Sequence, residues 1–377
     1  MSKLDLTMAR ADKMDEFYTS YEDVQKCIGA FIRYDKDVFK GKVILCPCDD
    51  PDRSQFVRYF MENFDVLGLN GLISVSYNGL GSQSSLDSEF ERGRFMRMYR
   101  ENDTVMTEKG ELKGSGDFRS SEVCALRDRA DIIITNPPFS LFREFIKWCS
   151  GKSIIILGNL NAVAYKEVFP LIKSGSVHLG PTVKDGVMWF SVPDGYPFRS
   201  SGYREEGGKR IIRVKGVRWY TNLPFDDDRK PLELNTMAYN LEHNNRLKKK
   251  LMDDFGMTEY PHYDNFDAIE VPFSNAIPSD YDGVMGVPIS FLDRMDDRFE
   301  IVDMSTRGPG DPKNRTKMYS KEDTEEYGNL NVSSVVRTEN GLVLTYTRVL
   351  IRFRKGGLYD YNLEDARRQG LCDVRKV

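Results

Sequence analysis

Apolar positions follow two patterns in roughly the first 160 residues of the chain. Lys42–Cys46, Asp131–Thr135 and Ser153–Gly158 contain unbroken apolar runs, and Leu72–Tyr77 is a further stretch rich in apolar and β-branched residues. Such runs are typical of strands buried on both faces of a parallel sheet. We therefore predict strands at these four positions.

Two amphipathic segments lie between these runs. In Ser54–Phe64 aromatic side chains recur at steps of three and four residues, and Ser140–Cys149 carries its apolar residues on one helical face. Asp50-Pro51, an acid followed by proline, is a signal for the start of the first helix. The alternation of strand and helix predicts a right-handed, parallel α/β sheet.

Two regions depart from this alternation. Residues 78–116 open with a Gly/Ser-rich stretch and continue with a predicted hairpin, Phe95–Tyr99 and Thr104–Leu112, which we interpret as a surface insertion. After residue 180 the pattern is β-rich and irregular. The strands predicted there are Val187–Val192, Ile211–Tyr220 and Leu342–Arg354.

Composition narrows the class of protein. With 377 residues, 40% apolar and 30% charged, the chain has the length for two domains with buried cores. It contains no run of about 18 apolar residues, so we expect no transmembrane helix, and its N-terminus lacks the apolar segment of a secretory signal. Six scattered cysteines and three scattered histidines argue against a disulfide framework or a metal site, and favour a reducing, cytoplasmic setting.

Positive charge gathers in three segments although the net charge is −4. Arg199–Arg218 contains seven Lys and Arg against two Glu, Arg307–Lys321 contains five against one Asp, and Arg246–Lys250 contains four. Each segment alone is typical of a solvated face. Together they favour an anionic partner such as DNA.

The most specific motif, Asn136–Phe139 (Asn-Pro-Pro-Phe), directly follows one apolar run and precedes an amphipathic helix. Open α/β sheets place their sites at the carboxyl ends of strands. The prolines fix φ and remove two N–H donors, so the loop is stiff and presents a side-chain carbonyl, a backbone carbonyl and an aromatic face. A proline-stiffened turn with a core phenylalanine is the alternative interpretation.

Such a loop suits the exocyclic amine of a planar substrate, whose conjugated lone pair makes it a poor nucleophile. Acceptors on Asn136 and Pro137 would bind its two hydrogens, favour a pyramidal nitrogen and stabilise the positive charge that develops as a methyl group arrives. Phe139 would stack on the substrate ring. We predict Asn136, Pro137, Pro138 and Phe139 as the catalytic residues.

Six segments carry a resemblance to a known family: Asp15–Thr19 (DEFYT), Cys46–Phe56 (CPCDDPDRSQF), Gly116–Phe118 (GDF), Asn136–Phe139, Tyr281–Leu292 (YDGVMGVPISFL) and the basic stretch Arg348–Lys355. In this order they resemble the EcoRI-type adenine-specific DNA modification methylases over nearly the whole chain. The resemblance implies a Rossmann-like methyltransferase fold with a mostly parallel, seven-stranded sheet. It also implies a catalytic domain in residues 1–220 and a β-rich target-recognition region in residues 221–377.

The resemblance further implies S-adenosylmethionine as cofactor, with S-adenosylhomocysteine as product and no metal. The implied cofactor-binding residues are Phe17, Tyr18, Thr19, Cys48, Asp49, Asp50, Asp117 and Phe118. Each has an ordinary structural alternative. Asp49 or Asp50 could cap the Ser54–Phe64 helix, Asp117 could be a turn residue, and Phe17 and Tyr18 could simply pack. The loop at Cys48–Asp50 also lacks the glycines that methyltransferases at large carry there.

A flipped base needs a second aromatic neighbour, and strongly basic strands could contact DNA. The predicted substrate-binding residues are Trp219, Tyr220, Phe190, Arg213, Lys215 and Arg218. The pair Trp219–Tyr220, which follows a basic strand, is the preferred candidate. Aromatic residues in strands are more often part of the core, so packing is the alternative for each ring.

These observations predict a methyltransferase that acts on N6 of a flipped-out adenine in double-stranded DNA. The family precedent implies a monomer, with GAATTC as a candidate site and a cognate restriction endonuclease acting separately, and we expect it with the DNA of the cytoplasm. The same chemistry on RNA adenine or on a protein glutamine is an alternative, and a DNA-binding protein without catalysis is another.

Overall fold

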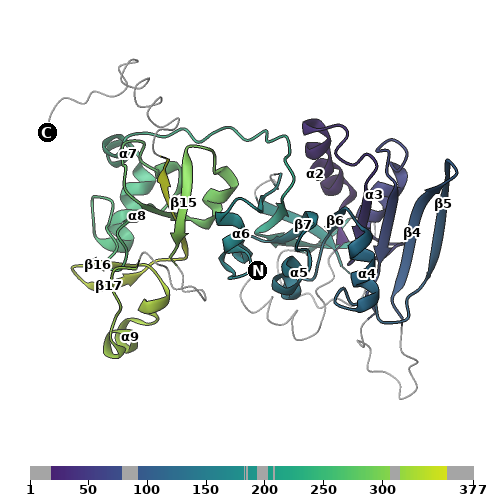
Figure 1. Cartoon of the computed structure of the whole chain (residues 1–377). Coiled ribbons are helices and arrows are strands. Elements are labelled where there is room, and N and C mark those ends of the chain that lie inside the picture. The colour runs from purple at the N-terminus through teal and green to yellow at the C-terminus, as the bar shows by residue number, and fades with distance from the viewer. Residues whose placement is uncertain are drawn as a thin grey trace. The chain divides into compact units, whose positions relative to one another are not determined.

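The computed structural model describes residues 18–78, 92–181, 183, 186–192, 203–206, 209–305 and 315–354. It divides into two compact units (Figure 1). The first contains residues 1–162 and 174–228, and the second contains residues 163–173 and 229–377. A short segment thus leaves the first unit and the chain then returns to it. The assignment of catalysis and target recognition to separate regions stays a prediction.

The first unit is built on an eight-stranded sheet in which the four central strands β3, β2, β6 and β7 run parallel. This confirms the predicted α/β fold with a parallel centre and the four predicted strands, although the sheet has eight strands rather than seven. The strands in spatial order are β5 (Thr104–Glu111), β4 (Arg94–Glu101), β3 (Gly71–Val75), β2 (Val43–Cys46), β6 (Ile132–Thr135), β7 (Ser153–Asn159), β12 (Val217–Thr221) and β8 (His178–Leu179).

The hairpin within residues 78–116 is part of this sheet and not a surface insertion. Strand β4 pairs antiparallel with β3 over five residue pairs, from Gly71–Tyr99 to Val75–Phe95. A buried parallel strand such as β3 leaves unpaired backbone groups at its edge, and the hairpin satisfies them. Residues 79–91, the first part of the predicted insertion, lie outside the described residues.

The predicted strand Ile211–Tyr220 is two strands that belong to different sheets. Gly216, with φ of +77°, separates β11 (Lys209–Lys215) from β12, which pairs with β7. A positive φ bends the chain in a way that few residues other than glycine accept. The sheet that contains β11 has the order β1 (Tyr18–Thr19), β9 (Val187–Ser191), β11, β10 (Tyr203–Glu206).

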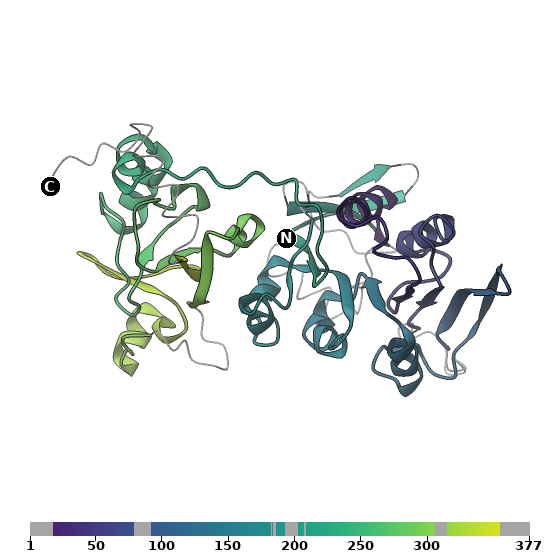
Figure 2. The same ribbon diagram turned by 45° about the horizontal axis from the view of Figure 1, so that its top comes forward.

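Helices cover both faces of the large sheet. Figure 2 shows α2 (Tyr21–Tyr34) and α3 (Gln55–Glu62) on one face, and α4 (Ser121–Arg129) and α5 (Phe142–Trp148) on the other. One apolar cluster joins the first two helices to the large sheet and to β9 and β11, with Phe31, Phe60 and Phe190 fully buried in it. The helices predicted at 54–64 and 140–149 are thereby confirmed, the second beginning with a 3-10 turn, η1 (Phe139–Leu141).

The second unit has a four-stranded sheet and a separate hairpin. The predicted strand Leu342–Arg354 is split between them, because β17 (Gly341–Leu344) belongs to the hairpin and β18 (Arg348–Phe353) belongs to the sheet. Arg348 in the basic stretch is buried and pairs with Glu270 at 2.5 Å, so this cation serves the core.

Its strands are β13 (Ile269–Glu270), β14 (Met285–Pro288), β18 (Arg348–Phe353), β15 (Phe299–Met304), β16 (Val335–Thr338) and β17 (Gly341–Leu344). Its helices are α6 (Phe169–Lys173), α7 (Met237–His243), α8 (Asn245–Phe255) and α9 (Lys321–Tyr327). Among the described residues of the whole chain, no helix has the length and apolar character needed to cross a membrane.

Candidate active site

The carboxyl ends of the central strands bring the sequence motifs to one edge of the large sheet. Strand β2 pairs with β3 at Cys46–Ser74 and with β6 at Leu45–Ile133, so the loops that follow the three strands leave the sheet side by side. These loops contain Cys48–Asp50 and Asn136–Phe139, two of the motifs predicted from the sequence. Parallel sheets bind ligands at this edge.

The predicted catalytic loop begins at Thr135, the fully buried last residue of β6. The Oδ1 atom of Asn136 is out of contact with solvent. The carbonyl of Pro138 accepts the N–H of Leu141 at 3.0 Å and starts η1, whereas the carbonyl of Pro137 accepts no hydrogen bond among the described residues. Phe139 is half-buried and packs against the apolar cluster. The loop thus combines a sheltered amide oxygen with an available backbone acceptor.

The side chain of Asp49 is buried, and its carboxylate oxygens accept hydrogen bonds from other residues of the protein. Its carboxylate accepts hydrogen bonds from the hydroxyls of Ser54, at 2.7 Å, and Thr135, and from the backbone N–H of Asn136. Burial raises the pKa of Asp49 to about 6, although the three hydrogen bonds act against the rise. These bonds leave little capacity for the cofactor's amino group, which argues against the predicted direct cofactor contact of Asp49.

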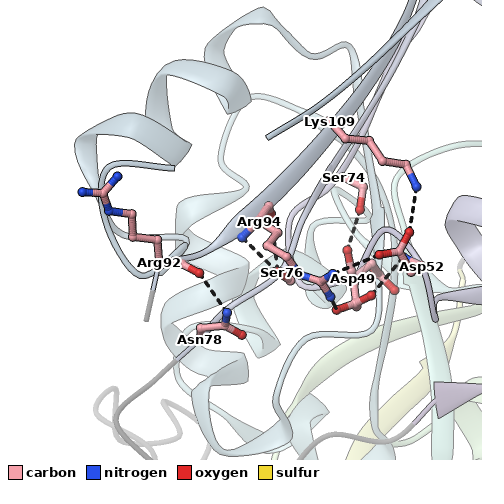
Figure 3. Close-up of polar contacts among 9 residues, drawn as sticks. Asp49, Asp52, Ser74, Ser76, Asn78, Arg92, Arg94 and Lys109 are labelled. Atoms are coloured by element: carbon pink, nitrogen blue, oxygen red, sulfur yellow. Dashed lines mark hydrogen bonds and ion pairs between the residues drawn. The ribbon is translucent and has the colours of Figure 1, made fainter. Parts of the chain in front are cut away.

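The β4–β5 hairpin holds the rest of this loop, and Figure 3 shows Arg94 and Lys109 reaching Asp52. Arg94 on β4 contacts Asp50 at 2.5 Å and Asp52 at 3.0 Å, and Lys109 on β5 contacts Asp52 at 2.7 Å. Neither Asp49 nor Asp50 caps α3, because the cap is Ser54, whose hydroxyl accepts the N–H of Phe56 at 3.1 Å. Ion pairs with the hairpin thus fix this loop, which contains no glycine.

Cys48 belongs to the loop after β2, two residues beyond the end of the strand. Burial raises the pKa of its thiol well above the ordinary value, and the carboxylates of Asp49 and, more weakly, Asp117 add to the rise. The segment before α4 lies near this loop, because Asp49 donates its N–H to Val75 at 3.0 Å and Asn78, three residues further along, donates its N–H to Ser115 at 2.9 Å. The structure therefore brings Cys48 and Asp117 to one region, as the resemblance implies.

Gly116 determines where Asp117 lies. It has φ of +80°, and a Cβ there would be 2.2 Å from the carbonyl oxygen of Ser76, so only glycine fits beside the end of β3. The carboxylate of Asp117 accepts hydrogen bonds from Arg119 at 2.7 and 2.9 Å, which lower its pKa. Arg119 also bonds Glu144 on α5 at 2.8 Å. Asp117 is thus an ionised, half-buried acceptor held in place by a neighbouring cation.

Phe118, which the resemblance implies as a cofactor-binding residue together with Asp117, is buried. Its ring meets Phe145 and Trp148 edge-on, with centroids 5.1 and 5.6 Å apart. This packing anchors the Gly116–Asp117 segment to α5. The ring therefore positions its neighbour Asp117, and its predicted direct contact with a cofactor is not supported by the structure.

The N-terminal motif reaches the same unit through β1, which pairs with β9 at Thr19–Phe190 and Tyr18–Ser191. Thr19 is buried, and its hydroxyl oxygen has no hydrogen-bond partner among the described residues. A buried hydroxyl without a partner costs stability, so its presence favours a ligand that completes it. Phe17 lies outside the described residues, and so does the side chain of Tyr18.

The three rings predicted to flank a flipped base are buried in the core. Phe190 and Tyr220 are fully buried, and Trp219 is 3% exposed. Tyr220 donates its hydroxyl to the carbonyl of Asn159 at 2.8 Å, and Trp219 meets Phe56 edge-on at 5.8 Å. A buried ring offers no face to a base, so we correct this prediction in favour of the packing alternative.

The basic strand β11 carries cations on its solvent side. Arg213 and Lys215 are exposed and alternate with the buried Ile212 and Val214, whereas Arg218 is half-buried and bonds the carbonyl of Val217 at 2.8 Å. Arg213 and Lys215 are therefore accessible to an anionic partner. Most of the basic segment 307–321 precedes residue 315 and lies outside the described residues.

Sequence reasoning missed the residues that organise this site. Ser54, Thr135 and Arg94 make the decisive contacts, yet none belongs to the predicted site. Ser54 carries a recognisable cap signal, because it directly precedes a segment in which apolar residues recur at helical spacing. Arg94 carries none, because its role depends on the pairing of β4 with β3, which no local pattern reveals.

Comparisons with known proteins agree with this geometry. A family model described as "Adenine-specific methyltransferase EcoRI" matches residues 5–354. The chain is 38% identical over 307 residues to the type II methyltransferase M.EcoRI of Escherichia coli. The matched region covers 79% of this chain and 88% of the relative. The chain is 31% identical over 301 residues to M.MpnI of Mycoplasma pneumoniae, covering 78% and 84%. It is 34% identical over 301 residues to M.MgeORF184P of Mycoplasma genitalium, with the same coverage. No solved structure matches the chain.

Proposed function

The chain belongs to the EcoRI family of adenine-specific methyltransferases, and we propose that it methylates N6 of a flipped-out adenine at a specific site in double-stranded DNA. The observation that carries this proposal is the place of Asn136–Phe139. The loop leaves β6 at the carboxyl edge of the parallel strands, beside the loop that follows β2. The family membership and the position of the motif in the fold are independent observations, and they point to the same reaction.

Asn136 would act on the nucleophile. Its amide oxygen, sheltered from water, would accept one hydrogen of the N6 amine, and the available carbonyl of Pro137 would accept the other. Two acceptors placed in this way favour the pyramidal nitrogen and stabilise its developing positive charge. Because the Oδ1 atom is out of contact with solvent, the base reaches it after a local opening of the surrounding side chains.

Pro138 and Phe139 would orient the base. Pro138 starts η1 and so ties the loop to α5, and Phe139, half-buried against the core, provides an apolar ring surface beside Asn136. A base taken out of the duplex loses its stacking energy, and an aromatic ring restores part of it. These residues thus hold the base while Asn136 and Pro137 hold its amine.

The residues present fit S-adenosylmethionine, and the observation that supports the fit is the buried, unsatisfied hydroxyl of Thr19. Thr19, Asp117 and the Cys48–Asp50 loop would hold the cofactor, with Asp117 as a fixed anionic acceptor. When bound, the cofactor supplies an activated methyl group on a positively charged sulfur. Neither a metal nor a covalent enzyme intermediate is needed for this proposal, since the amine itself is the nucleophile.

DNA recognition would involve the cations of β11 and the basic segments of the second unit. Arg213 and Lys215 are exposed, as are Arg246, Lys248 and Lys249 on α8. Phosphate contacts of this kind position a protein on the duplex, whereas the bases are read by side chains in the grooves. The enzyme would act as a monomer on the DNA of the cytoplasm, with a restriction endonuclease of the same specificity as a separate partner.

Transfer of labelled methyl groups to nucleic acid tests the proposal. Purified protein is incubated with labelled S-adenosylmethionine and either duplex DNA or RNA, and the product nucleosides are separated after digestion. We expect N6-methyldeoxyadenosine from DNA, and none with an Asn136→Ala variant that retains the wild-type melting temperature. Label in RNA or protein alone, or undiminished transfer by the variant, would refute the proposed substrate or the role of Asn136.

A further inference from the structure

The buried carboxylate of Asp49, in the loop after β2, bonds both the start of α3 and the end of β6. On its own side it accepts the Ser54 hydroxyl at 2.7 Å, at the start of α3. Across the sheet it accepts the Thr135 hydroxyl and the N–H of Asn136. Thr135 and Asp49 are 86 positions apart in the sequence, so this link is purely tertiary.

The backbone of Asp49 is fixed as firmly as its side chain. Its N–H donates to the carbonyl of Val75 at 3.0 Å, and its carbonyl accepts the hydroxyl of Ser74 at 2.5 Å (Figure 3). Asp49 is therefore attached to β3 through its backbone and to β6 through its carboxylate. A buried anion that accepts three hydrogen bonds rigidifies its surroundings, because any displacement leaves a donor or the charge unsatisfied.

We propose that Asp49, through Thr135 and the Asn136 N–H, is a positioning residue that sets the amide of Asn136 relative to the cofactor loop. The inference rests on the proposed function, in which the Asn136 side chain holds the N6 amine. Methyl transfer requires the amine and the methyl donor to be aligned within fractions of an ångström. One carboxylate that holds both loops would fix this alignment, which is a different role from binding the cofactor.

A substitution at Thr135 can remove the hydrogen bond between its hydroxyl and Asp49 without changing the shape of the core. Thr135→Val removes the hydroxyl at nearly constant volume, and Thr135→Ser retains it. Thr221→Val is the matched control, since Thr221 is also a fully buried threonine of the large sheet, and its hydroxyl accepts the N–H of Leu223 at 3.0 Å, away from Asp49. Each variant is tested as the full chain, with melting temperature, S-adenosylmethionine affinity and single-turnover methylation of duplex DNA.

We expect Thr135→Val to lower the single-turnover rate about tenfold or more while the dissociation constant for S-adenosylmethionine stays within about threefold of wild type. Thr135→Ser should restore the rate to within about threefold, and Thr221→Val should keep it even where its melting temperature falls. A Thr135→Val rate equal to that of wild type would overturn the inference. So would a loss of cofactor affinity in parallel with the rate, because the link would then serve binding.

Hydrogen exchange separates this inference from the proposed function. The Asn136 amide is protected by the Asp49 carboxylate, so its exchange should accelerate in Thr135→Val and not in Thr221→Val. If wild-type protein transferred no methyl group to DNA, the proposed function would fail, yet the exchange would still report the link. Unchanged exchange at Asn136 in Thr135→Val would refute the link itself.

Discussion

Arg94 on β4 and Asp50 in the loop after β2 form an ion pair at 2.5 Å across 44 positions of sequence. The same guanidinium contacts Asp52 at 3.0 Å. The hairpin that extends the sheet therefore also holds the loop that the family resemblance assigns to the cofactor. This loop contains no glycine, and ion pairs with the hairpin fix its shape.

Removal of Arg94 should loosen this loop with little effect on the fold. The Arg94 side chain is 45% exposed, and exposed ion pairs contribute less than about 1 kcal/mol to stability. We expect Arg94→Ala to weaken S-adenosylmethionine binding by about threefold or more in calorimetric titration, at a nearly unchanged melting temperature. Arg97→Ala is the control, because Arg97 lies on the same strand but bonds Glu108 at 2.6 Å. Equal affinity in the two variants would contradict a role for the ion pairs of Arg94.

The raised pKa of Asp49 gives its substitution a defined pH dependence. The folded state holds the Asp49 proton up to about pH 6, whereas the unfolded chain releases it near pH 4. Between these values the folded state binds more protons, so the contribution of Asp49 to stability falls as the pH rises and is constant above about pH 6. Relative to Asp49→Asn, wild type should therefore lose stability over this window, by at most about 3 kcal/mol in denaturant unfolding.

Asp52 provides the opposite sign for comparison. Hydrogen bonding by Lys109 lowers its pKa, so its stabilising contribution is present above the ordinary pKa of an aspartate and is lost as the pH falls through the lowered value. The stability difference between wild type and Asp52→Asn should thus shrink at acid pH.

For Asp49, the contradicting result is a stability difference between wild type and Asp49→Asn that stays constant from about pH 4 to about pH 7. It would show that the Asp49 carboxylate is not buried as described.

Gly116 should not tolerate a side chain. The added Cβ in Gly116→Ala would lie 2.2 Å from the Ser76 carbonyl at a φ of +80°, so backbone must move, and Asp117 moves with it. We expect a loss of about 2 kcal/mol or more in the free energy of unfolding, together with weaker cofactor binding. Gly114→Ala is matched, since nothing lies within 4 Å of its Cβ position. Two variants of equal stability would argue against the close approach at Gly116.

Thr19 should separate stability from cofactor affinity. Because its hydroxyl lacks a partner among the described residues, Thr19→Val should leave the free energy of unfolding unchanged or raise it by up to about 1 kcal/mol. The same change should weaken S-adenosylmethionine binding about fivefold if the cofactor completes this hydroxyl. Ser20→Ala should do the reverse: it removes the cap of α2, costs about 1 kcal/mol and leaves affinity intact. Unchanged affinity in Thr19→Val would remove Thr19 from the site.

The central strands and the position of the Asn136–Phe139 loop were predictable from sequence because both are local patterns. Unbroken apolar runs mark buried parallel strands, and Asn136–Phe139 lies directly between such a strand and an amphipathic helix. The arrangement around Asp49 was not predictable. Its carboxylate accepts hydrogen bonds from Ser54 and from Thr135, the latter 86 positions away, and no local pattern distinguishes a bridging aspartate from one that binds a cofactor.

Side-chain exposure explains the remaining differences. Trp219 and Tyr220 follow a basic strand, which suggested a nucleic-acid surface, but Gly216 turns the chain into the large sheet and buries both rings. Likewise residues 78–116 interrupt the alternation of strand and helix, which favours a surface insertion, whereas the hairpin in this stretch pairs with β3. The polarity of the hairpin reflects an edge of the sheet that is largely exposed to solvent.

Methylation mapping in cells tests directly whether the chain methylates adenine in DNA and whether Asn136 is required. DNA from bacteria that express the wild-type chain is sequenced by a long-read method that detects modified bases, beside DNA from cells that express Asn136→Ala at the same level. We expect N6-methyladenine at one sequence motif with wild type and none with the variant. Unmodified DNA in both cultures, or the same methylation in both, would contradict it.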